Sequence, residues 1–218
     1  MNERPALGLI VVVTAAGFLG IVLDIHSVFG FAAESFLTIE RSSIVSNDGD
    51  NNELTAELDV EGVQIPTNGT HGAFGYGIIT EDGDEEEDDT ILVAHTHSGL
   101  LDSESQRFIE DPIWHNHFVR LGDAEQCGED RGVIDITWQS PGEVGIDDNI
   151  ATISDVPTGE FEGWHSMTGE SLLITLGQAA SVSDVISFKL DPVFGEDGLK
   201  AVCVTDIRSA EEEVVNPD

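Results

Sequence analysis

The chain has 218 residues, of which 43 are Asp or Glu and only 8 are Lys or Arg, for a formal net charge of −35. So few cationic side chains argue against binding to nucleic acids, whose phosphates are recognised by Lys and Arg, and against adsorption to anionic membrane surfaces. Because 40% of the residues are hydrophobic, the chain still has enough apolar side chains for a folded core.

The acidic residues are spread along the whole chain, and lysine occurs only as Lys189 and Lys200. High salt screens the mutual repulsion of so many carboxylates, which would otherwise oppose a compact fold. We therefore expect a halophilic, archaeal source. An acidic protein that buffers cations is the alternative interpretation.

Near the N-terminus, residues 6–23 form an uncharged and mostly apolar run, with Arg4 before it and Asp24 after it. Its length suits either a short transmembrane helix or the core of a signal peptide. The flanking charges favour a cytoplasmic N-terminus with the rest of the chain exported. We expect residues 1–33 to be a signal or anchor helix. The protein is then held at the outer face of the cell membrane, or is secreted if the helix is cleaved.

Residues 34–210 contain runs rich in Val, Ile, Thr and Phe, separated at short intervals by Gly, Pro, Asn and Asp, as is typical of antiparallel strands. The expected strands are residues 36–45, 54–64, 72–80, 90–97, 113–121, 133–139, 150–156, 171–176, 182–190 and 199–207. This pattern predicts one all-β domain, an antiparallel β-sandwich of the immunoglobulin-like, Greek-key or jelly-roll type, with a barrel as the alternative. Residues 211–218 are expected to form an acidic tail.

Three further features bear on an exported domain. Cys127 and Cys203 are the only cysteines, which predicts one disulfide, with free thiols or Cys127 as a metal ligand as the alternatives. Asn68 begins an Asn-Gly-Thr acceptor for N-glycosylation. Residues 81–89 are almost purely acidic, but they lack the ligand spacing of an EF-hand. A solvated loop is therefore preferred over a Ca²⁺ site.

Four of the seven histidines form two His-x-His pairs, His95 with His97 and His115 with His117. This spacing places both rings of a pair on one face of a strand, and in each strand that face also carries Ile or Val. If residues 98–114 close a symmetric hairpin, His97 lies opposite His115 and His95 lies opposite His117. The sequence thus predicts four rings that converge at the base of one loop.

Imidazole is a common ligand of zinc and copper, so we expect His95, His97, His115 and His117 to bind one of these two ions. The long connection between the pairs is expected to contain a helical turn capped by Asp102. Further donors near the rings are Asp102, Glu104, Glu110, Asp111 and, more distantly, His165.

The predicted function is therefore metal binding without catalysis, on an exported surface protein. A metal-dependent enzyme is one alternative, in which three histidines leave a coordination position for water or substrate. A metal-free structural or adhesion module is another, in which the histidines hydrogen-bond to carboxylates. Residues 93–98 resemble the strand-end motif of the metallo-β-lactamase superfamily. Gly99 and Leu100 stand where that motif continues with Asp and His, so the resemblance implies no activity for this chain.

Overall fold

The computed structural model describes residues 35–47, 53–69, 71–80, 90–177, 184–196 and 198–210. These residues form an all-β structure in which every pair of neighbouring strands is antiparallel. The expected signal or anchor helix, the acidic run at residues 81–89 and the acidic tail lie outside the described residues. Within the described ranges, no helix is both long and apolar enough to cross a membrane.

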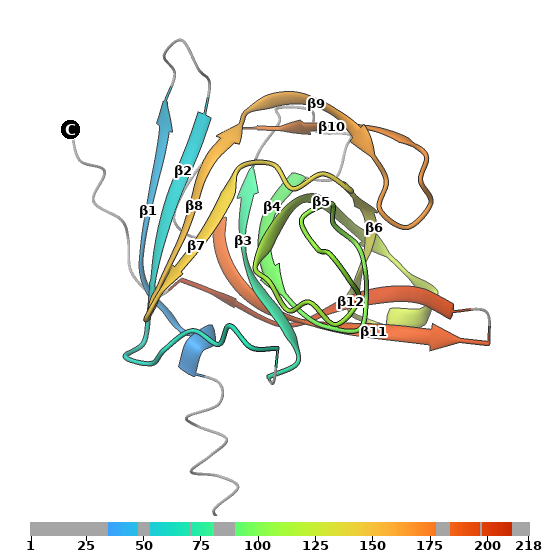
Figure 1. Ribbon diagram of the computed structural model, residues 1–218, viewed down its shortest axis with the longest axis horizontal. Coiled ribbons are helices and arrows are strands. Elements are labelled where there is room, and N and C mark those ends of the chain that lie inside the picture. The colour runs from blue at the N-terminus through green and yellow to red at the C-terminus, as the bar shows by residue number, and fades with distance from the viewer. Residues whose placement is uncertain are drawn as a thin grey trace, which may run out of the picture.

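Six strands close into a barrel, which Figure 1 shows as a ring. In spatial order they are β11 (Val185–Gly195), β12 (Gly198–Ser209), β6 (Arg131–Ile136), β5 (His115–Asp123), β4 (Thr90–Thr96) and β3 (Ala73–Thr80), which pairs again with β11. Successive side chains on a strand point to opposite faces, so every second residue points into the barrel. One buried cluster, which includes Ile91, Val93, Val119, Phe188 and Val204, comes from these alternate positions.

A four-stranded sheet covers one side of the barrel. Its strands are β1 (Ile39–Asn47), β2 (Glu53–Val60), β8 (Ile150–Pro157) and β7 (Glu143–Asp147), in that order. Leu54 and Ile153 of this sheet share a buried cluster with Leu92 and Phe118 on the outer face of the barrel. A hairpin of β9 (Gly159–Trp164) and β10 (Ser171–Leu176) and two short 3₁₀ turns, η1 (Ser35–Leu37) and η2 (Glu125–Cys127), complete the described structure.

The prediction of an all-β antiparallel domain is confirmed, but the predicted sandwich is wrong in one respect: one of the two layers is a closed barrel. Every residue of β4 is buried, because its inner face lines the barrel and its outer face packs on the four-stranded sheet. Strands β7 and β9 were not expected, since Gly and acidic residues in both segments lower their strand propensity. Pairing with β8 and β10 makes them strands nonetheless.

The predicted disulfide between Cys127 and Cys203 is present and joins η2 to β12. It lies beside the seam between β12 and β6, where the two strands pair only through Cys203 with Gly132 and Val204 with Arg131. This is the shortest ladder of the barrel, so the covalent bond reinforces the place where backbone pairing contributes least.

We expect a variant with both Cys127→Ser and Cys203→Ser to be less stable by about 2–4 kcal/mol, because the native bond closes a long loop in the unfolded chain. Denaturant unfolding at fixed salt measures this difference. Hydrogen exchange should become faster first in β6 and β12. Unchanged exchange at this seam would show that the ladder holds without the disulfide.

Candidate metal centre

The two histidine pairs lie on neighbouring strands, but in a different register from the predicted one. His95 lies opposite His115, and His117 lies opposite Val93. The predicted pairing of His97 with His115 is therefore wrong: the observed register differs from it by two residues. The ladder ends early because the chain turns inward after β4: Thr96 Oγ1 donates to the carbonyl of Pro112, and the amide of Gly99 donates to the carbonyl of Ile109.

Despite the changed register, the four rings converge as predicted. The ring centroids of His95 and His115 are 4.5 Å apart, and His95 lies 5.0 Å from both His97 and His117. All four histidines are buried, and none of these residues is more than 5% exposed. The expected face is also correct, since the rings continue the inward face that carries Val93 and Val119.

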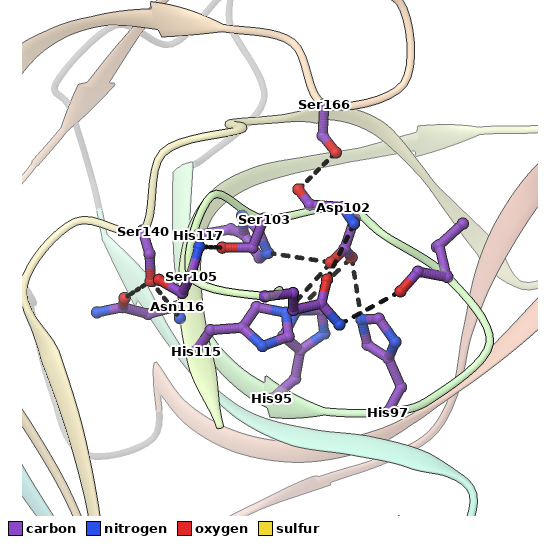
Figure 2. A network of polar contacts seen from close by, with 12 residues as sticks. His95, His97, Asp102, Ser103, Ser105, His115, Asn116, His117, Ser140 and Ser166 are labelled. Atoms are coloured by element: carbon purple, nitrogen blue, oxygen red, sulfur yellow. Dashed lines mark hydrogen bonds and ion pairs between the residues drawn. The ribbon is translucent and has the colours of Figure 1, made fainter. Parts of the chain in front are cut away.

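The carboxylate of Asp102 lies at the centre of the four rings (Figure 2). Its Oδ2 is 3.1 Å from Nε2 of His97 and 3.9 Å from Nε2 of His95. Its Oδ1 is 3.2 Å from Nε2 of His115 and 3.9 Å from Nε2 of His117. All four rings thus point the same nitrogen at one buried carboxylate. We call these five residues the His/Asp cluster.

Asp102 does not cap a helix as expected, because residues 98–114 contain turns and bends but no helix. The connection instead folds inward and carries Asp102 to the rings. The side chain of Gln106 holds its backbone: Gln106 Oε1 accepts the Asp102 amide at 3.0 Å, and Gln106 Nε2 donates to the carbonyl of Leu100 at 3.2 Å. From outside the loop, Ser166 Oγ donates to the carbonyl of Asp102 at 2.6 Å.

The other predicted donors do not reach the cluster. Glu104 and Glu110 are exposed, and Glu104 accepts the amide of Ser140. Asp111 accepts the amide of Arg107 on the loop surface. His165 makes hydrogen bonds away from the cluster. Its Nε2–H donates to the carbonyl of Ile134, and its Nδ1 accepts the amide of Met167.

The orientation of two rings is fixed from behind by backbone carbonyls. Nδ1 of His115 lies 2.9 Å from the carbonyl of Ile113, and Nδ1 of His117 lies 2.6 Å from the carbonyl of Thr137. A carbonyl only accepts hydrogen bonds, so both Nδ1 atoms carry the proton. In a neutral ring the Nε2 lone pair then faces the cluster, which is the orientation that second-shell partners impose on metal-binding histidines.

Both ring nitrogens of His115 face hydrogen-bond acceptors. Its Nδ1–H donates to a carbonyl while its Nε2 faces a carboxylate oxygen of Asp102, and both of these oxygens are acceptors. A neutral ring has only one N–H and cannot satisfy both. One additional proton between His115 Nε2 and the Asp102 carboxylate, or a metal ion bound by both, satisfies this contact.

Several ring nitrogens in the cluster are buried and have no hydrogen-bond partner among the described residues. They are both nitrogens of His95, Nδ1 of His97 and Nε2 of His117. An unpaired buried polar atom costs roughly 1–3 kcal/mol. Most buried polar atoms in folded proteins have a partner. Metal coordination would provide a partner for two of them, Nε2 of His95 and Nε2 of His117.

Burial determines the electrostatics of the cluster. Desolvation, together with the neighbouring ring His115, lowers the pKa of His95 well below its ordinary value. Desolvation likewise lowers the pKa of His117 to about 4. Burial alone would raise the pKa of Asp102. The hydrogen bonds from His115 and His97 outweigh it and hold that pKa well below its usual range. At neutral pH His95 and His117 are therefore neutral and Asp102 is a carboxylate, the protonation states in which these groups bind metals.

The lowered pKa of His117 predicts that the metal-free protein loses stability in mild acid. The unfolded chain binds a proton on this ring below about pH 6.5, whereas the folded chain binds it only near pH 4. The contribution of this ring to the free energy of unfolding is therefore fully present above pH 6.5. It is lost as the pH is lowered towards 4, and the loss is on the order of 3 kcal/mol. Urea unfolding in the presence of a chelator at pH 7.5 and pH 4.5 measures the loss. His117→Gln should reduce it.

A glycine allows the neighbouring strand to approach the cluster. Gly75 of β3 pairs with His95, and a Cβ atom at this position would lie 2.5 Å from the carbonyl oxygen of Ala94 and 2.7 Å from Cβ of His95. Any side chain here would displace β4 at the point where it positions His95.

An apolar cavity of about 160 Å³ occupies the barrel and meets the His/Asp cluster. Its walls include Val93, Phe188 and Val204, and the cluster contributes His95, His97 and Asp102 to its lining. A metal ion held by the cluster would therefore be accessible from the cavity rather than sealed from it.

Sequence reasoning placed the four rings correctly but missed the central role of Asp102, which it named only as a nearby donor and helix cap. It also missed Gln106 and Ser166, which position Asp102. No local signal marks these two residues, because a loop glutamine and a loop serine are usually solvated polar side chains.

Comparison with known proteins yields no family assignment: no protein-family model, no curated protein and no solved structure matches this chain.

Proposed function

We propose that this protein binds one divalent transition-metal ion, zinc or copper, in the His/Asp cluster. The observation that carries the proposal is the convergence of four buried imidazole Nε2 atoms on one buried carboxylate. Imidazole suits zinc and copper, and a carboxylate oxygen completes the coordination sets in which zinc is found.

The ligands we assign are His95, His115, His117 and Asp102. One donor atom from each of these four residues lies within 4.8 Å of the others, so a modest contraction brings all four to a single ion. His97 was predicted as a ligand and lies outside this group, although its Nε2 is 3.1 Å from Asp102. We assign it the role of holding the carboxylate in place by donating its Nε2–H, as outer-shell partners of metal ligands do.

A metal-free structural cluster is less well supported. Hydrogen bonds to Asp102 account for Nε2 of His97 and of His115. They leave both nitrogens of His95, Nδ1 of His97 and Nε2 of His117 buried without partners among the described residues. A core that needed only structural stability would be better served by apolar side chains at these positions.

A metal-dependent enzyme remains a second candidate, favoured by one observation. The cavity reaches the cluster on the side of His95, His97 and Asp102, so a small molecule in the cavity has access to the proposed ion. With His95, His115, His117 and Asp102 as ligands, such a molecule would bind as a fifth ligand, in the five-coordinate state that catalytic zinc sites can adopt.

Elemental analysis tests the proposal. Protein prepared without a histidine tag, reconstituted with zinc or copper and dialysed at high salt, should retain about one ion per chain, with affinity that falls as the pH is lowered. His71→Gln is the matched control, because His71 is exposed and outside the cluster. Less than about 0.2 ion per chain, after reconstitution with either metal, would rule out the proposed function.

We also propose that the protein is exported and stays at the cell surface of a halophile through an N-terminal anchor. The disulfide and the scarcity of lysine support this setting. Asn68 is exposed in the loop between β2 and β3 and would be accessible to glycosylation. Fractionation of the source cells, with a blot for the intact chain, tests this proposal.

A further inference from the structure

We infer that the barrel cavity binds a small, uncharged and mostly apolar molecule with a single hydroxyl group, a phenol or a short alkanol, whose oxygen reaches the metal ion. This inference rests on the proposed function for its metal ion. The cavity itself is a feature of the barrel and does not depend on that ion.

The walls of the cavity determine the body of the ligand. Apart from the cluster, Ser98 and Gly99, the lining is made of aliphatic residues, Met167 and two phenylalanines, Phe188 and Phe194. Its volume is about 160 Å³. An engineered apolar cavity of roughly 150 Å³ stays dry and binds benzene, so a six-carbon ring or a chain of similar size fits here.

The entrance is also apolar. Met167 and Phe194 line the cavity and are 42% and 61% exposed, so they mark where it reaches the surface. Large exposed apolar side chains at a cavity mouth, on a protein with so many surface carboxylates, are consistent with entry of an apolar molecule.

The part of the cavity that the His/Asp cluster lines determines the head group. His95, His97 and Asp102 are its titratable lining groups, and Ser98 is the remaining polar side chain. A ligand with an apolar body and one polar end therefore complements this lining. Its body contacts the apolar walls, and its oxygen coordinates the metal ion.

The charge of the head group follows from what the cavity lacks. No Lys or Arg is among the described residues that line it, and Asp102 already contributes a negative charge. A carboxylate head would have the metal ion as its only counter-charge and would approach through a strongly acidic protein surface. A neutral hydroxyl avoids both costs.

Binding of three matched probes to the cobalt(II)-loaded protein tests the inference. The probes are phenol, benzene and benzoate, followed by calorimetry and by the visible absorption of cobalt. We expect phenol to bind at least about tenfold more tightly than benzene or benzoate and to change the cobalt spectrum, because coordination adds about 1.4 kcal/mol or more. In the metal-free protein phenol and benzene should bind about equally.

A cavity-filling variant locates the site. Val204→Phe, on the wall opposite β4, should abolish binding of phenol and benzene and leave cobalt content unchanged. Val45→Phe is the control, since Val45 is 48% exposed and outside the cavity. The probe comparison on the unmodified chain stands even if Val204→Phe does not fold.

Each contrary outcome is distinct. Cobalt uptake without phenol binding, or phenol binding with an unchanged cobalt spectrum, overturns this inference and leaves the proposed metal site intact. Preference for benzoate overturns the neutral head group. A chain that takes up no cobalt, zinc or copper overturns the proposed function together with the oxygen contact. Benzene binding by that chain still tests the apolar cavity.

Discussion

Replacing Asp102 with asparagine should lower metal affinity by about 100-fold or more, equivalent to about 2.7 kcal/mol, and leave the metal-free protein nearly as stable as before. The amide keeps the shape of the carboxylate but loses its charge. In the metal-free cluster the amide N–H of asparagine can donate to Nε2 of His115 and so replace the additional proton between the two residues. We expect the free energy of unfolding of the metal-free protein to change by less than about 1 kcal/mol.

The same substitution distinguishes a metal centre from a structural ion pair. If the cluster exists to pair charged histidines with Asp102, removing the carboxylate leaves a buried charge without a partner. The metal-free protein should then lose about 3–5 kcal/mol. Urea unfolding with and without a chelator, together with metal titration, gives both quantities. Glu104→Gln is the matched control, an acid-to-amide change on the same loop at an exposed position outside the cluster.

The second large effect is expected at His117. His117→Gln should lower metal affinity by more than about 100-fold, beyond the roughly 10- to 100-fold typical of an outer-shell change. This side chain can still donate to the carbonyl of Thr137, as His117 does through Nδ1, but it removes the ring nitrogen that faces Asp102. Competition with a chromophoric chelator measures the affinity.

His97→Gln provides the comparison that tests the assignment of ligands. Because His97 contacts Asp102 but lies outside the group of four mutually close donors, its loss should cost only about 10- to 100-fold in affinity. A loss as large as that of His117→Gln would make His97 a ligand and remove its assigned positioning role. A negligible loss for both would contradict the metal centre as a whole.

Much of the site could be predicted from the sequence because strand periodicity is a local property. The i, i+2 spacing places His95 and His97 on one face, and His115 and His117 on another, and the Ile and Val residues on those faces indicate burial. These four rings do converge inside the structure. The predicted disulfide is also present, and its connectivity was fixed because two cysteines allow only one pairing.

The register could not be predicted, because it depends on where the connection begins to turn. The predicted symmetric hairpin assumed that residues 98–114 form the whole connection between the two strands. Instead the ladder stops at His95 and His115, and the hydrogen bond of Thr96 to Pro112 replaces the next pair of the ladder. That contact joins side chain to backbone across the loop, and the hydrophobic pattern carries no information about it.

The role of Asp102 was hidden for a related reason. In a chain with 43 acidic residues, any one carboxylate is most simply interpreted as solvated. Asp102 is buried because Gln106 and Ser166 fold its loop inward, and Ser166 is 64 residues away in the sequence. Closure of the barrel also depends on such distant pairing, of β3 with β11 and of β6 with β12, so strand patterns alone favoured a sandwich.

The most direct measurement of the metal centre is anomalous diffraction from a crystal of the reconstituted protein, recorded at the absorption edge of the bound metal. We expect one strong peak at about 2.0–2.2 Å from Nε2 of His95, His115 and His117 and from an oxygen of Asp102. A peak elsewhere would contradict the proposed metal centre. So would the absence of any peak in a structure where Asp102 still hydrogen-bonds to His97 and His115.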